Sequence, residues 1–257
     1  MDGSVTALVS VVHLMPDGRL QAHTPMDLAR VQGGHLIDRQ RPSFGWSPHP
    51  GAKQARRSPV RTKVTKEGRD WWIGTGADVY WIASATDVGK TITAAIPRVF
   101  QAYATFHELF DPAAPITEYE EAASITEQER AVVEHLVDLS GDQPWWLGYL
   151  DTGATDVVFP DAPMVSLYSD LDYVLVEAGP EQALTWRVGH MRSQYGVLPD
   201  LFFPADRSWL VSALWDDTWT CVGGTTELVD RLRLDPRIQA RPVRLGEDAT
   251  PPGREGL

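Results

Sequence analysis

Apolar residues recur along this chain in short runs that are separated by turn-forming residues. Four runs follow one another at 145–150, 156–159, 164–168 and 173–179. Such tight spacing leaves no room for crossover helices, so we expect these strands to pair antiparallel. Two further hairpins are predicted. One joins 71–73 to 79–83 through Gly74, Thr75 and Gly76, and the other joins 208–215 to 218–223 through a turn at Asp216 and Asp217.

Three segments show the apolar spacing and end signals of helices. In 124–140, Ser124 and Glu127 have capping-box spacing, an apolar stripe follows, and Gly141 supplies the stop. Pro180 suits the first turn of a short helix over 180–187. The segment 225–234 has a helical face of Leu228, Val229 and Leu232 and ends at Asp235-Pro236. The pattern as a whole predicts an α+β fold, mainly an antiparallel sheet with about three helices.

Residues 1–70 differ in composition from the rest of the chain. Much of this part is rich in Pro, Gly, Gln and Arg and lacks helical or strand periodicity, which predicts a basic, flexible extension. We expect a single acidic domain over 71–246 and a loose tail over 247–257. A tail that binds nucleic acid is the alternative interpretation of the basic stretch 53–63.

Charge divides along the same boundary. Residues 1–70 hold eleven Lys and Arg against six Asp and Glu, a net charge of +5, whereas residues 71–257 hold twelve against twenty-nine, a net charge of −17. Such an acidic domain repels nucleic acid and attracts a basic partner. The bland alternative is that acidity only keeps the protein soluble.

Composition also limits where in the cell the protein is expected and which disulfide, metal and cofactor chemistry it can have. No apolar run is long enough for a membrane helix, and the first residues lack signal-peptide features, so we expect a cytoplasmic protein. Cys221 is the only cysteine, which excludes an internal disulfide and a thiolate metal cluster. His135 has no second ligand at a metal-binding spacing, so we expect it at the surface or the core edge. No metal and no cofactor is predicted.

The stretch 81–91, "WIASATDVGKT", ends in the lysine and hydroxyl of a phosphate-binding loop. Gly89, Lys90 and Thr91 fit that motif, although Ser84 stands where its first glycine belongs. The stretch resembles the longer loop of dethiobiotin synthetases, and "YVLVEAG" at 173–179 resembles a second segment of that family, with Glu177 in the carboxylate position. The resemblance implies an ATP-Mg-dependent enzyme that uses a degenerate loop at 83–91.

The stretch "YLDTGATDVVF" at 149–159 resembles the catalytic segment of retroviral-type aspartic proteases. That mechanism needs two carboxylates that share a proton. Because only Asp151 lies in such a triplet, the resemblance implies a symmetric dimer. The alternative is a tight turn in which Asp151 and Thr152 bond to the backbone.

Ten tryptophans are the other unusual feature of the composition. Adjacent pairs such as Trp145 and Trp146 should point to opposite sheet faces. Trp215 and Trp219 flank the acidic turn Asp216-Asp217, and these four residues make a candidate interaction surface.

Residues 96–257 resemble a group of proteins from GC-rich bacteria to which no activity is attached, as in "IPRVFQAYATF" and "FFPADRSWLVSALWDDTW". That resemblance adds no function. The charge, the acidic turn and the lack of a complete catalytic set favour a non-enzymatic domain that binds a basic protein, such as an inhibitor or immunity-type protein. The two enzyme hypotheses above remain the alternatives.

Overall fold

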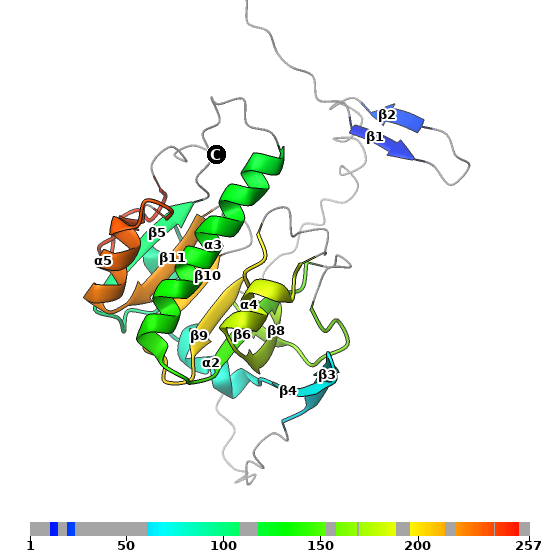
Figure 1. Ribbon diagram of the computed structural model, residues 1–257, viewed down its shortest axis with the longest axis horizontal. Coiled ribbons are helices and arrows are strands. Elements are labelled where there is room, and N and C mark those ends of the chain that lie inside the picture. The colour runs from blue at the N-terminus through cyan, green and yellow to red at the C-terminus, as the bar shows by residue number, and fades with distance from the viewer. Residues whose placement is uncertain are drawn as a thin grey trace, which may run out of the picture. The chain divides into compact units, whose positions relative to one another are not determined.

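The protein is described by a computed structural model (Figure 1). It describes residues 11–14, 20–23, 61–107, 118–152, 158–168, 170–188, 196–213, 219–238 and 240–251, with backbone only in the first two ranges and in 118–124. The chain divides into two units, 1–56 and 57–257. In the first, β1 (Val11–Leu14) and β2 (Leu20–His23) form an antiparallel hairpin. The prediction of a flexible extension otherwise falls, up to residue 60, outside the described residues.

The second unit is built on one ten-stranded sheet in which every described neighbouring pair is antiparallel. From one edge to the other the strands are β12 (Arg241–Pro242), β5 (Ala102–His107), β11 (Trp219–Gly224), β10 (Leu210–Ala213), β9 (Leu201–Pro204), β6 (Trp145–Leu150), β8 (Leu171–Ala178), β4 (Arg69–Ile73) and β3 (Lys63–Lys66). The short β7 (Val165–Leu167) also pairs with β8. The predicted α+β fold with a mainly antiparallel sheet is confirmed.

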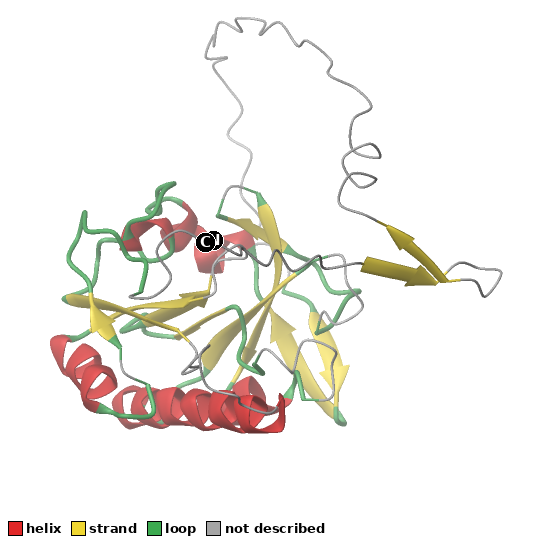
Figure 2. Cartoon of the chain, turned by 90° about the horizontal axis from the view of Figure 1, so that it is seen from above, coloured by secondary structure: helices red, strands yellow, loops and turns green. Residues whose placement is uncertain are grey.

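Helices cover both faces of the sheet, as Figure 2 shows. The helices α3 (Glu118–Ser140), α4 (Pro180–Thr185) and α5 (Thr226–Leu234) pack on one face. On the other face lie α2 (Gly76–Ala83), the 3-10 helix η1 (Ile92–Ala94) and part of the C-terminal segment. The sheet therefore has two apolar cores, which we call the α3 face and the α2 face.

The sequence correctly locates the ends of several helices. The helix α3 ends at Ser140, before Gly141 at φ +60°, although it begins earlier than Ser124, at Glu118. In α5, Leu228, Val229 and Leu232 are buried as predicted, and Asp235 caps the end. The three predicted helices are thus confirmed, and α2 is an additional one.

The hairpin predicted over 71–83 is wrong in its second half, because 76–83 forms the helix α2. The carboxylate of Asp78 accepts a hydrogen bond from the Thr75 backbone N–H at 2.8 Å, which caps the helix start. Val79 and Ile82 lie one turn apart and are buried, while Tyr80 is exposed. An apolar run this short does not reveal its period, so the strand and the helix look alike in sequence.

The sheet also extends beyond the limits expected for the acidic domain. The strand β3 starts at Lys63, before the expected boundary at residue 70, and Arg61 donates to the Asp78 carboxylate at 2.7 Å. At the other end, residues 247–251 fall in the segment predicted to be a loose tail. Ala249 is nevertheless buried, and its N–H donates to the Lys90 carbonyl at 2.8 Å.

Candidate functional site

Two carboxylates lie opposite each other where β6 and β8 meet at one end of the sheet. The β6–β8 register runs to Leu150 and Tyr173, and beyond it the Asp151 N–H donates to the Asp172 carbonyl at 2.8 Å. Because side chains alternate along a strand, Asp151 and Asp172 both project to the α3 face. Opposite residues in such a ladder have Cβ atoms about 5 Å apart. We call Asp151 and Asp172 the carboxylate pair.

The turn between β7 and β8 presents a third carboxylate beside this pair. Tyr168 and Asp170 have φ values of +46° and +74°, which side chains with a Cβ rarely adopt. The Tyr168 hydroxyl donates to the Ala95 carbonyl at 2.9 Å and accepts from the Ser212 hydroxyl at 3.1 Å. The Ser166 hydroxyl donates to Asp172 at 2.6 Å. Tyr168 and Asp170 thus have strained backbone conformations, and the Asp170 side chain is exposed.

A buried ion pair lies close to the carboxylate pair, because Asp200 bonds to the backbone of Leu150, the residue before Asp151. Arg187, just after α4, donates to the Asp200 carboxylate, and the two side chains are only 8% and 9% exposed. Arg187 also donates to the Leu198 carbonyl at 2.6 Å, and Asp200 accepts from the Leu150 N–H at 2.8 Å. The guanidinium lies 5.1 Å from the centre of the Tyr149 ring. These bonds connect α4 and the loop before β9 to the end of β6.

The same loop is held from α3 by the buried carboxylate of Glu129. It accepts hydrogen bonds from the backbone N–H groups of Val197, at 2.8 and 3.0 Å, and Leu198, at 2.9 Å. Gly196 has φ +116°, and a Cβ at this position would lie 2.6 Å from Glu129 Oε1. Glu129, Arg187 and Asp200 therefore form a charged clamp that fixes residues 196–200.

Two buried tyrosines lie at this end of the sheet on opposite faces, Tyr149 on the α3 face and Tyr173 on the α2 face. Their hydroxyls have no hydrogen-bond partner among the described residues. Burial raises the pKa of both well above the usual tyrosine value, so both stay neutral and can only add dipoles to the site.

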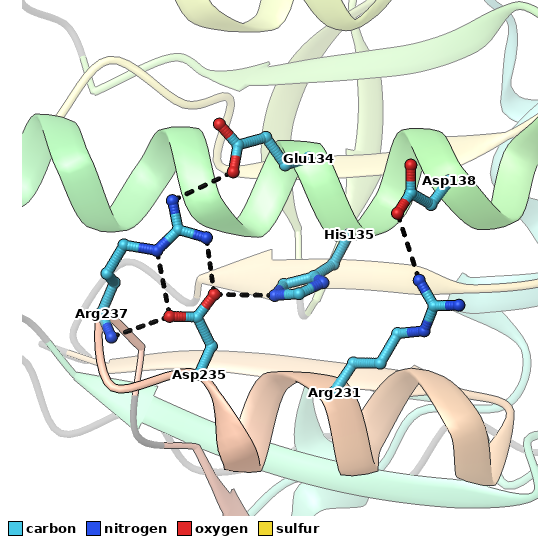
Figure 3. Close-up of polar contacts among 6 residues, drawn as sticks. All are labelled: Glu134, His135, Asp138, Arg231, Asp235 and Arg237. Carbon is cyan, nitrogen blue, oxygen red and sulfur yellow. Dashed lines mark hydrogen bonds and ion pairs between the residues drawn. The ribbon is translucent and has the colours of Figure 1, made fainter.

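At the junction of α3 and α5, acidic side chains form ion pairs and hydrogen bonds with basic side chains (Figure 3). Asp235 accepts from His135 Nε2 at 2.9 Å and from Arg237, which also donates to Glu134 at 3.0 Å. Arg231 pairs with Asp138 at 3.2 Å. Hydrogen bonds from Arg237, with a smaller effect of His135, hold the pKa of Asp235 well below its usual range. This network joins two helices, and His135 lies at the core edge as predicted.

The residues predicted for nucleotide binding lie in two places. Gly89, Lys90 and Thr91 lie between α2 and η1, whereas a phosphate-binding loop connects a strand to a helix. The Thr91 hydroxyl bonds to Thr93, and its backbone forms a bridge with Asp248. Glu177 lies in β8, paired with Trp72 and Trp146, and forms an ion pair with Arg61 at 3.6 Å. ATP binding therefore stays a prediction without support from this geometry.

The acidic turn predicted as an interaction surface falls largely outside the described residues, which include Trp219 but not Trp215, Asp216 or Asp217. Trp219 pairs with His107 at the start of β11 and packs against the core of the α2 face. Its Nε1 is buried. Trp219 thus contributes to the core more than to an exposed surface.

Sequence reasoning singled out Asp151 but not Asp172, Glu129, Arg187 or Asp200. The consecutive strands around "LDT" and "LDY" contain the signal for the carboxylate pair, but only the register places one aspartate opposite the other. Among the described residues, no cluster of three or more His, Cys, Asp or Glu is arranged to hold a metal ion.

Comparison with known proteins gives no relative: the chain matches no family, no curated protein and no solved structure. None of the helices in the described part of the chain has the length and apolarity needed to cross a membrane. Function is therefore inferred from the carboxylate pair, its supporting clamp and the distribution of charge.

Proposed function

We propose that this chain is a non-enzymatic binding protein that docks a basic protein partner on the carboxylate pair, as an inhibitor or immunity-type protein would. The arrangement of Asp151 opposite Asp172 is the observation that supports it most. A lysine or arginine of a partner that contacts both carboxylates forms charge-assisted hydrogen bonds with them. These bonds favour binding.

The distribution of ion pairs supports the same site. Acidic residues of α3 and α5 are neutralised by arginines, as in Asp138–Arg231 and Asp230–Arg233. Among the described residues, neither Asp170 nor Asp172 is in an ion pair. The charge of these two carboxylates, at the β7–β8 turn and next to it, would help to steer a basic partner to that end of the sheet.

The charged clamp supports binding by keeping the site rigid. Arg187 neutralises Asp200, so the buried pair adds no net charge next to the carboxylate pair. Glu129 and Arg187 fix the loop that carries Asp200, and Asp200 in turn fixes the end of β6. A site that is already ordered loses less conformational entropy when a partner binds.

The experiment is affinity capture on the full chain at low salt, followed by titration of the captured basic protein. Asp151→Asn and Asp172→Asn together keep the shapes of the side chains and remove both negative charges. We expect this double variant to bind roughly tenfold or more weakly and with a smaller salt dependence. Asp138→Asn with Asp230→Asn is the matched control, with the same change of charge on helices. If both double variants lost the same affinity, the effect would be one of net charge alone, which would contradict the proposed site.

One observation also favours the hydrolase hypothesis as the second candidate. A dimer was expected because only Asp151 lies in an Asp-Thr-Gly triplet, but Asp172 lies opposite it in the same sheet. Hydrolysis of denatured casein at acidic pH that disappears in Asp151→Asn, with no protein partner captured, would favour this candidate over binding. Without such hydrolysis, the protein-binding role remains.

A further inference from the structure

The strand β3 is the last described strand at one edge of the sheet (Figure 1). The Ile73 N–H donates to the Thr62 carbonyl at 2.9 Å, so the alternate residues Val64 and Lys66 also bond to β4 in an antiparallel ladder. The backbone groups of Lys63 and Thr65 must then point away from β4. Among the described residues no strand pairs with them. Such an edge can accept an added strand.

Cations surround this open edge, and each of the four lies over an aromatic ring. The pairs are Arg61 over Trp146 at 5.1 Å, Lys63 over Trp72 at 4.4 Å, Lys66 over Phe159 at 5.9 Å and Arg69 over Trp71 at 4.7 Å. A ring beneath a cation limits its freedom while its charged group stays in water. The hairpin of β3 and β4 therefore presents ordered positive charge on a chain that is acidic from residue 71 onward.

Two of these cations oppose each other directly. Lys66 and Arg69 are partners in the β3–β4 register, which places both side chains on the same face. Arg61 and Lys63 have ion-pair partners in Asp78 and Asp70, but no ion pair of Lys66 or Arg69 occurs among the described residues. Opposed like charges weaken a hairpin unless an anion lies between them.

We infer that the β3 edge binds an extended acidic segment of a partner protein, which adds a strand to the sheet. Lys63 and Thr65 supply the backbone hydrogen bonds. Lys66 and Arg69 receive an acidic side chain of the added strand. A second copy of β3 is disfavoured as the occupant because it would bring the same set of cations to the edge. This surface is separate from the carboxylate pair and does not depend on the function proposed for it.

The test is fluorescence anisotropy with the full chain and a labelled peptide of alternating Glu and Val. Both Thr65→Pro and Thr65→Ala remove the hydrogen bond from the Thr65 hydroxyl to Asp70 at 2.9 Å and leave the backbone bonds to β4 intact. Only Thr65→Pro also removes the outward N–H. We expect Thr65→Pro to weaken binding roughly tenfold or more and Thr65→Ala to stay near the parent. Lys66→Glu with Arg69→Glu should weaken binding as strongly, unlike the control Arg233→Glu with Arg244→Glu. Circular dichroism confirms that each variant is folded.

Four outcomes would overturn this inference. The parent could fail to bind the acidic peptide, or Thr65→Pro could bind as well as Thr65→Ala. An oligothymidine could also bind tightly to the parent. If Lys66→Glu with Arg69→Glu abolished that binding and Thr65→Pro left it unchanged, the edge would be a nucleic-acid surface instead. A dimer of the parent that Thr65→Pro abolishes would show that the edge pairs with a second copy.

Discussion

Trp145 and Trp146 are adjacent in β6 and are both buried, one in each core of the sheet. Trp145 packs edge-on against Trp209 with ring centres 4.8 Å apart, while Trp146 lies under Arg61. Alternation predicts that the pair faces opposite ways, so that at most one member can face any single core. Both are buried because helices and connecting segments cover both faces.

Replacement of either tryptophan should therefore be costly. We expect Trp145→Ala and Trp146→Ala each to lower the free energy of unfolding by about 3–5 kcal/mol, because each leaves a large cavity. Trp72→Ala, where the side chain is 42% exposed, should cost much less. Urea unfolding of the three variants measures this. A mild effect of Trp146→Ala would show that the α2 face is not a true core.

The buried ion pair should be sensitive to the loss of one partner. Arg187→Met leaves the Asp200 carboxylate buried without its cation, and the Leu198 carbonyl loses a donor. We expect a loss of about 3–5 kcal/mol in the free energy of unfolding. A double-mutant cycle with Asp200→Asn separates the pair from its other bonds. Additive effects of the two substitutions would show that the two charges are not coupled.

Gly196 should not tolerate a side chain. Its φ of +116° and the 2.6 Å approach to Glu129 Oε1 both oppose a Cβ. We expect Gly196→Ala to destabilise the fold by more than about 1 kcal/mol. Gly76→Ala is the control, because Gly76 lies in the first turn of α2 with no atom near its Cβ position, and it should be neutral or stabilising. Equal thermal stability of the two variants would contradict the proposed clamp.

The α3–α5 network predicts how stability depends on pH. Arg237 and His135 depress the pKa of Asp235 in the folded state below its unfolded value. Asp235 therefore contributes stability above about pH 4, and this contribution is lost as the pH falls from there toward the folded pKa. Asp235→Asn should be less stable than the parent at pH 7, with a smaller gap at low pH. Urea unfolding from pH 7 to 2.5 measures this. If the difference in the free energy of unfolding between the parent and Asp235→Asn did not change with pH, the ionisation of Asp235 would not be linked to stability.

Local signals predicted the fold class well because the strands and most helix ends depend on neighbouring residues. Pro180, Gly141 and Asp235 marked real helix boundaries. The helix α2 was missed because its apolar run has no clear period, although Thr75 and Asp78 have the spacing of a cap. A local cap was therefore more informative than the apolar pattern.

The candidate site depends on contacts that no local pattern contains. Arg187 and Asp200 are thirteen residues apart, and Glu129 contacts Val197 across sixty-eight. Asp172 becomes a candidate site residue only through the strand register, which places it opposite Asp151. The cations of β3 were assigned to the extension because the sequence before residue 70 lacks periodicity, yet the aromatic rings that order them come from other strands and loops.

Carbodiimide cross-linking of the full chain to its captured basic partner most directly tests the proposed role of the carboxylate pair. This reagent joins a carboxylate to an amine in direct contact with it, and mass spectrometry identifies both residues. We predict cross-links from Asp151 or Asp172 to a partner lysine that disappear with Asp151→Asn and Asp172→Asn and persist with Asp138→Asn and Asp230→Asn. Cross-links confined to Glu and Asp of α3 and α5, unchanged in the first double variant, would contradict it.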